Sequence, residues 1–275
     1  MRRSSRLVDT VTYTVLIVGL LITLVPFVQS LLTALKTPEQ FATSPATALP
    51  NPVTLQNFGD LLARYGFLRA VLVTLAVVVT IVVVQVTCSV LAAYAFARLR
   101  FPGRDVLFWA YLGTLMVPAI VTTIPLYTLF AQAGLRDTFW GIIAPSLLGS
   151  PYAVFLLRQH FLAIPHDLLD AATLDGAGTL RTLWSIAVPV SRPIIATLVV
   201  ITAVSHWNNF LWPLIITSGG DWQVLTVATA SLQTQYNGNW TLVMAAAVIS
   251  LTPLLALFLV FQRQIVSSLA IRGIH

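Results

Sequence analysis

The chain has 275 residues, of which 57% are hydrophobic and only 9% are charged. A soluble domain carries charge on about a quarter of its residues, so this composition excludes a water-soluble globule and indicates an integral membrane protein. The net charge of +6 comes from scattered basic residues rather than from a run, which excludes a phosphate-binding groove for nucleic acid. The single cysteine, Cys88, lies in an apolar run and is expected to be a small buried residue.

Six apolar stretches are long enough to form membrane-spanning helices, each of which needs about 20 residues. They are residues 11–35, 67–97, 106–131, 139–157, 194–217 and 240–261. The first stretch is too long for the apolar core of a signal peptide and lacks a small-residue cleavage site, so we expect an uncleaved helix. The chain is therefore predicted to be all-α, a single transmembrane domain of residues 1–275.

The distribution of basic residues predicts the orientation of these helices. With both termini in the cytoplasm, the inner side carries eleven arginines and the outer side carries four basic residues, Lys36, Arg64, Arg69 and Arg136. Cytoplasmic loops carry the excess of Lys and Arg, so this orientation is favoured over its inverse. The segment 164–193, between the fourth and fifth spans, is thereby predicted to be cytoplasmic.

The segment 164–193 is amphipathic and acidic, and it is predicted to form two short helices separated by a break. Pro165 suits the first turn of a helix, and Asp167 and Asp170 suit the positive end of its dipole. Gly176 readily adopts a left-handed C-cap conformation, so the first helix should end there. Helical spacing resumes after Thr179. The segment is expected to be a bent, exposed protrusion.

The fifth span contains an unusual run of polar and aromatic side chains on its outer half. The run consists of His206, Trp207, Asn208, Asn209 and Trp212. Ionisable and amide groups at this depth are expected to face the bundle interior or a cavity, where amides bind hydroxyls and aromatic rings bind the C–H faces of a polyhydroxylated solute. In the alternative, the tryptophans belong to an outer aromatic belt and the amides bind neighbouring helices.

Several motifs of energy-coupling and catalytic proteins are absent from the sequence. There is no G-x-x-x-x-G-K-[ST] for ATP phosphates and no H-E-x-x-H, and the four histidines do not have the spacing of metal ligands. No acidic residue lies deep in a predicted span, which argues against a carrier driven by protons or sodium. We therefore expect no enzyme activity and no cofactor on this chain, and an energy source on a partner.

The segment 164–193 resembles the cytoplasmic loop of the membrane subunits of binding-protein-dependent ABC importers, whose pattern is E-A-A-x3-G-x9-I-x-L-P. Asp170 begins the matching triplet, three residues separate the triplet from Gly176, and nine residues separate Gly176 from the run Ile186–Pro189. Two positions depart from the pattern, because Asp170 replaces Glu and Val188 replaces Leu. The alternative, an amphipathic helix on the bilayer surface, would favour Lys and Arg over this acidic first turn.

The resemblance implies a type I importer permease in the inner membrane of a bacterium, with a coupling helix that docks on an ATPase subunit. The implied coupling residues are Asp167, Asp170, Ala171, Ala172, Asp175, Gly176, Ala177 and Pro189. The implied partners are a second homologous permease, two ATPase subunits that hold ATP and Mg, and an extracytoplasmic solute-binding protein.

The fifth-span run and residues 262–273 resemble the carbohydrate-type group of these importers, which includes sugar and glycerol-phosphate permeases. A sugar or related polyol is thus the implied solute, with glycerol phosphate or a glycerophosphodiester as the alternative. A membrane scaffold that merely docks a soluble partner would be a different class of function. The resemblance also implies that Arg272 and Gly273 reach the ATPase dimer interface.

The predicted outer loop, residues 218–239, is implied by the resemblance to reach toward the binding protein. The candidate contact residues are Gly219, Gly220, Asp221, Trp222 and Tyr236. A plain connector with interfacial aromatic side chains explains this loop equally well.

Overall fold

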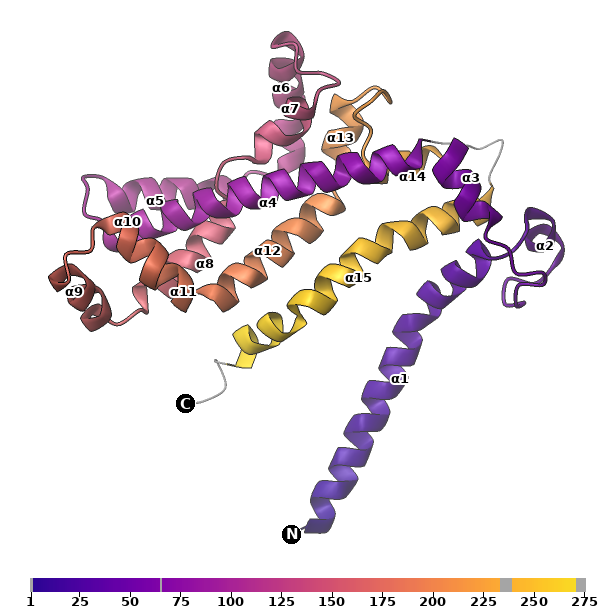
Figure 1. The fold of residues 1–275 in the computed structure, drawn as a ribbon, viewed down its shortest axis with the longest axis horizontal. Helices are drawn as coiled ribbons and strands as arrows, with labels where there is room; N and C mark the ends of the chain where they lie inside the picture. Colours follow the sequence, from indigo (N-terminus) through magenta and orange to yellow (C-terminus); the bar gives the residue numbers. More distant parts are fainter. Residues whose placement is uncertain (1, 65, 233–238, 271–275) are drawn as a thin grey trace. The chain divides into compact units, whose positions relative to one another are not determined.

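The computed structural model describes residues 2–64, 66–232 and 239–270, and every regular element in these ranges is helical (Figure 1). The three long helices are α1 (Arg2–Ala34), α4 (Phe67–Arg98) and α15 (Trp240–Ala270). Each contains a stretch that is long and apolar enough to cross a membrane. The all-α prediction is confirmed over the described residues.

The shorter helices form three bent pairs, each of which is apolar enough to count as one further span. The pairs are α5 (Arg104–Gly113) and η1 (Thr114–Met116) with α6 (Ala119–Gln132), then α7 (Phe139–Ile143) and η2 (Ala144–Ser146) with α8 (Pro151–Leu162), and residues 179–190 with α12 (Arg192–Trp207). The bends measure 98°, 42° and 81°. By length and composition, the described residues thus contain up to six spans.

The predicted fifth span, residues 194–217, contains two helices rather than one. α12 ends at Trp207, and α13 (Leu211–Ile216) begins after a three-residue break. Pro213 has no N–H to donate to the carbonyl of Asn209, which instead accepts a hydrogen bond from Thr226 Oγ1 at 2.8 Å. The Thr226 hydroxyl thus supplies the hydrogen bond that Pro213 cannot give to the Asn209 carbonyl.

The described chain divides into two compact units, one within residues 1–68 and 228–253 and the other within residues 69–227 and 254–275. The first unit contains α1, α2 (Pro38–Thr43) and α3 (Gln56–Arg64). The second contains most of α4 and all the helices from α5 to α13, and α14 (Leu225–Ser231) and α15 pass between the two ranges. The prediction of one transmembrane domain stays a prediction.

Asn57 of α3 joins three segments of the first unit. Its buried side-chain amide donates hydrogen bonds of 2.7 Å to the carbonyls of Ala34 and Lys36. Its side-chain oxygen accepts a hydrogen bond of 2.8 Å from the hydroxyl of Thr241, in the first turn of α15. The carbonyl of Ala34 has no partner within its own helix, since it lies at the end of α1. Asn57 therefore holds the end of α1 beside the start of α15.

We expect Asn57→Ala to lower the free energy of unfolding by about 3 kcal/mol, because each buried polar group left without a partner costs about 1–3 kcal/mol. Thermal or denaturant unfolding of the detergent-solubilised protein measures this loss. Gln56→Ala is the control, because Gln56 is exposed on the same helix. Equal losses in the two variants would contradict the role of Asn57.

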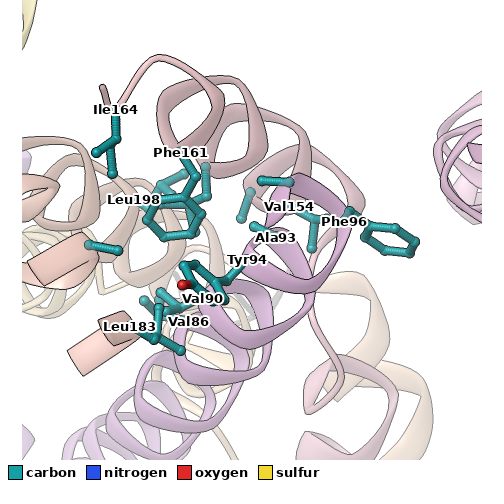
Figure 2. Packing of buried hydrophobic residues seen from close by; sticks show 14 of the residues in the cluster. Val86, Val90, Ala93, Tyr94, Phe96, Val154, Phe161, Ile164, Leu183 and Leu198 are labelled. Atoms are coloured by element: carbon teal, nitrogen blue, oxygen red, sulfur yellow. The ribbon is translucent and has the colours of Figure 1, made fainter. Parts of the chain in front are cut away.

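An apolar cluster forms the core of the second unit (Figure 2). It joins α4, α5, α8 and α12, and Tyr94 and Phe161 meet edge to face with ring centroids 5.8 Å apart. Ile164 and Leu183, which belong to the segment 164–193, are buried in the same cluster. These two buried side chains thereby pack the segment against the core of the second unit.

The break between η2 and α8 lies against polar side chains of α4. Gln85 Nε2 donates to the carbonyl of Ser146 at 2.8 Å, and the backbone N–H of Ser150 donates to Ser89 Oγ at 3.0 Å. A Cβ on Gly149 would lie 3.3 Å from backbone atoms of Ser89, so glycine permits this close approach. Within a membrane these contacts supply the partners that a broken helix needs.

Candidate functional site

The first half of the segment 164–193 is α9 (His166–Leu174), which ends in a Schellman motif. Gly176 has φ +77°, its N–H donates to the carbonyl of Thr173 at 3.0 Å, and the N–H of Ala177 donates to the carbonyl of Ala172 at 2.9 Å. Glycine is favoured here because a side chain at this φ is strained. The predicted helix end at Gly176 thus has the geometry expected from the sequence.

The second half of the segment begins at α10 (Thr179–Thr182), continues as a π-helical turn over Leu183–Ala187, and ends in α11 (Val188–Val190). Pro189 has no N–H for the carbonyl of Ser185 and would crowd it in a regular α-helix, which accounts for the wider turn before it. The side chains of Leu183 and Ala187 are buried, whereas Leu180 and Trp184 are exposed. This half therefore both packs on the core and presents an apolar outer face.

The predicted coupling residues lie together on and just after α9. Asp167, Asp170 and Asp175 are exposed, and none of the three forms an ion pair in the part of the chain that the structure describes. Ala172 is buried, while Leu174 is 89% exposed. Ala171 and Gly176 are exposed, and Ala177 and Pro189 are half-buried. The arrangement offers unpaired carboxylates and an apolar side chain to another protein, and the coupling role itself stays a prediction.

Sequence reasoning missed two arginines that join α4 to α8, one of which, Arg98, also attaches α9. Arg98 ends α4, and its Nη2 donates to the carbonyls of Phe161 at 2.5 Å and Ile164 at 2.6 Å, while its Nη1 lies 3.3 Å from Nε2 of His166. Arg158 of α8 donates in the other direction, from Nε to the carbonyl of Phe96 at 3.3 Å. The sequence showed both only as basic residues on the inner side.

The predicted pathway run is divided between the end of α12 and α13. His206 is half-buried and Trp207 buried in the last turn of α12, and the side-chain amide of Asn208 donates to the carbonyl of Val204 at 2.9 Å. Asn209 is half-buried, in the break before α13. Asn208 thus caps its own helix, while the roles of His206, Trp207 and Asn209 in a pathway stay predictions.

Trp212 makes a tertiary contact within the second unit. Its Nε1–H donates to the carbonyl of Gly141 at 3.1 Å, and its ring packs edge to face on Phe130 with centroids 5.6 Å apart. The indole N–H is thereby occupied inside the protein. These contacts give Trp212 a packing role, and its role in a pathway stays a prediction.

The outer-loop candidates are held by residues of neighbouring helices. Asp221 forms a 2.7 Å ion pair with Arg69 at the start of α4, and the Trp222 ring lies 5.6 Å from that of Phe139. Gly219 and Gly220 are exposed, and Gly219 has φ +83°. Tyr236 lies outside the described residues, as do Arg272 and Gly273. The contact of this loop with a binding protein stays a prediction.

Asp137 joins the α6–α7 connection to the start of this outer loop. Its carboxylate accepts hydrogen bonds from the N–H of Ser218 at 2.6 Å and from the Ser218 hydroxyl at 2.5 Å. These two bonds stabilise the ionised form and hold the pKa of the Asp137 carboxyl below its ordinary value of 3.8.

We expect Asp137→Asn to lower the melting temperature by the same amount at every pH from about 5 to 8, where the carboxyl is ionised in both the folded and unfolded chains. Because the folded-state pKa is depressed, the stabilisation by Asp137 is lost only as the pH falls through that depressed pKa, so the difference between the proteins should narrow below about pH 4. Glu39→Gln, an exposed acid on α2, is the control. A difference that varied between pH 5 and 8 would contradict this assignment.

Comparison with known proteins agrees with this architecture. A family model described as "Binding-protein-dependent transport system inner membrane component" matches residues 85–271. The chain is 34% identical to the sn-glycerol-3-phosphate transport system permease protein UgpE of Yersinia enterocolitica, over 98% of each chain. It is 32% identical to the arabinooligosaccharides transport system permease protein AraQ of Halalkalibacterium halodurans, over 82% of this chain and 81% of the other.

A solved structure shares the fold. The crystal structure of a bacterial ABC transporter involved in the import of the acidic polysaccharide alginate contains a chain that superposes with a TM-score of 0.82. The two chains are 24% identical, and the match covers 95% of this chain and 97% of the other. The fold is therefore that of an ABC importer permease. Together with the family model and the two relatives, this shows that the chain belongs to the family of inner membrane components of binding-protein-dependent transport systems.

Proposed function

We propose that this chain is one permease subunit of an ATP-driven importer and forms half of the pathway for a sugar or related polyol. The observation that carries the proposal is α9, an exposed acidic helix seated on the apolar helical core of a chain of this family. The names of relatives support the solute class, since AraQ is named for arabinooligosaccharides and UgpE for sn-glycerol-3-phosphate.

The proposed assembly contains a second permease, two ATPase subunits and an extracytoplasmic binding protein, with both termini of this chain in the cytoplasm. The ATPase subunits bind ATP and Mg, and this chain has no catalytic role. ATP binding draws the ATPases together, α9 moves with the subunit on which it docks, and the helices joined to α9 open the pathway outward. A scaffold without transport is disfavoured because the family is one of transport components.

Glycerol phosphate is the second candidate solute, favoured by the 34% identity to UgpE over 98% of each chain. The contacts of the described basic residues on the predicted outer side weigh against it. Arg69 pairs with Asp221, Arg136 lies 5.8 Å from the ring centroid of Tyr127, and Lys36 donates to the carbonyl of Ala46 at 3.1 Å. These three side chains already have partners within the chain, so an uncharged polyol is the preferred candidate.

A solute screen of the cognate binding protein tests the solute class. We expect sugars or polyols to raise the melting temperature of the binding protein. The complete importer should take up the same compound when it is labelled, and an excess of the unlabelled compound should inhibit that uptake. A rise with glycerol phosphate or glycerophosphodiesters alone would establish the second candidate. No ATP-dependent uptake of any of these compounds would refute the proposed function.

A further inference from the structure

The cytoplasmic ends of α4 and α8 are joined by a reciprocal pair of arginines, Arg98 and Arg158, which we call the arginine clamp. Arg98 of α4 donates to the last turn of α8, and Arg158 of α8 donates to the last turn of α4. The last four carbonyls of a helix have no partner within it and carry its negative end, so two guanidinium groups suit these positions. Each helix thus donates a guanidinium hydrogen bond to a carbonyl in the last turn of the other.

Only Arg98 of this pair extends the clamp to α9. Its second carbonyl partner is Ile164, in the three-residue link between α8 and α9, at 2.6 Å. Its other terminal nitrogen lies 3.3 Å and 3.5 Å from the two ring nitrogens of His166, the first residue of α9. By contrast, Arg158 lies 4.2 Å from the ring centroid of Phe108 and 3.8 Å from Asp105, both on α5.

The position of Arg98 links the movement of α9 to that of α4 and α8. α9 and α10 lie at the end of the second unit where α4 ends (Figure 1). A fork that bonds the end of α8, the link and the start of α9 leaves little freedom for α9 to turn about the link. Earlier in α4, Gln85 and Ser89 bond the broken segment before α8. α4 therefore bonds the start of α9 through its last residue and the break before α8 through Gln85 and Ser89.

We propose that Arg98 is the positioning residue of energy coupling, which makes α9 move as one body with the ends of α4 and α8. The inference rests on the proposed function, in which α9 receives the movement of the ATPase. Its distinctive consequence is that loss of the Arg98 fork separates ATP hydrolysis from uptake. A residue that only stabilises the fold would lower both together.

The test replaces Arg98 by lysine in the complete importer, reconstituted with its ATPase subunits, second permease and binding protein. Arg98→Lys keeps the positive charge, and so the membrane orientation, but has one terminal nitrogen in place of the two that bond the carbonyls and His166. We expect assembly and ATP hydrolysis to persist, while solute molecules imported per ATP hydrolysed fall by about tenfold, within the range of coupling effects between sites.

Two lysine variants serve as matched controls. Arg100→Lys lies two residues further along, at an exposed position, and should leave the uptake-to-hydrolysis ratio unchanged. Arg158→Lys weakens the α4–α8 contact without touching α9, so it should lower the melting temperature but leave the ratio unchanged. His166→Ala removes one of the three contacts of Arg98, so it should lower the ratio by less than Arg98→Lys.

The outcomes separate this inference from the proposed function. A ratio for Arg98→Lys equal to that of Arg100→Lys, or an equal drop for Arg98→Lys and Arg158→Lys, would overturn the role of Arg98. Absence of ATP-dependent uptake in the unmodified importer would instead refute the proposed function. Assembly that survives Leu174→Asp, with coupling intact, would refute docking through the exposed end of α9.

Discussion

Gly176→Val is expected to abolish ATP-dependent uptake while the protein remains inserted in the membrane. Gly176 has φ +77° at the end of α9, and no atom outside its immediate neighbours lies within 4 Å of the place that a Cβ would take. The Cβ therefore meets no clash, and the positive φ by itself costs about 1–3 kcal/mol in backbone strain. Relief of that strain must undo the Schellman motif and redirect the chain between α9 and α10.

Uptake of labelled solute by the complete importer measures this effect, and we expect a loss of at least about tenfold. Gly178→Val is the matched control, because Gly178 lies two residues away, also in open space, with an extended backbone at φ −73° and ψ 167° that valine adopts readily. Membrane insertion is checked by the amount of protein in washed membranes. Normal uptake by Gly176→Val would refute the assignment of this segment to coupling.

Gly141→Ala is expected to produce the largest loss of stability from a single added methyl group. A Cβ on Gly141 would overlap the carbonyl oxygen of Leu135, which belongs to the backbone and cannot swing aside. The residue is buried, its N–H donates to Thr138 Oγ1 at 2.9 Å, and its carbonyl accepts the indole N–H of Trp212. Any shift that relieves the overlap disturbs these two hydrogen bonds.

We expect Gly141→Ala to lower the free energy of unfolding by about 3 kcal/mol, the upper part of the range for overpacked sites. Gly113→Ala is the control, because Gly113 is helical and nothing lies within 4 Å of its Cβ position, so alanine should be neutral or slightly stabilising there. Unfolding in detergent measures both. Equal melting temperatures for the two variants would contradict the close approach at Leu135.

Gly176 and Gly141 both require glycine, but the sequence indicates that requirement only for Gly176. Gly176 could be identified from the sequence, because a glycine that follows an acidic amphipathic helix marks a left-handed cap. Gly141 could not, since the atom that excludes a side chain belongs to a turn six residues away and the space depends on how that turn folds. A sequence pattern can predict a helix cap, because the cap depends on neighbouring residues. It cannot predict that two stretches of backbone come close together.

The amino-acid sequence by itself determined the class of fold, the apolar stretches and the end of α9. These features follow from short-range physics, because bilayer thickness demands long apolar runs and a left-handed backbone demands glycine. The spacing from Asp170 to Pro189 also sufficed to predict the family, which the match over residues 85–271 shows.

Only the tertiary structure decided where the spans break and how α9 is attached. At the break before α13 the hydroxyl of Thr226 bonds the carbonyl that Pro213 leaves free, and α9 is attached by Arg98, which bonds carbonyls 63 and 66 residues further along the chain. A main-chain carbonyl is the same in every residue, so no sequence pattern marks which one an arginine will bind. That choice is made when α4 and α8 pack and bring their free ends together.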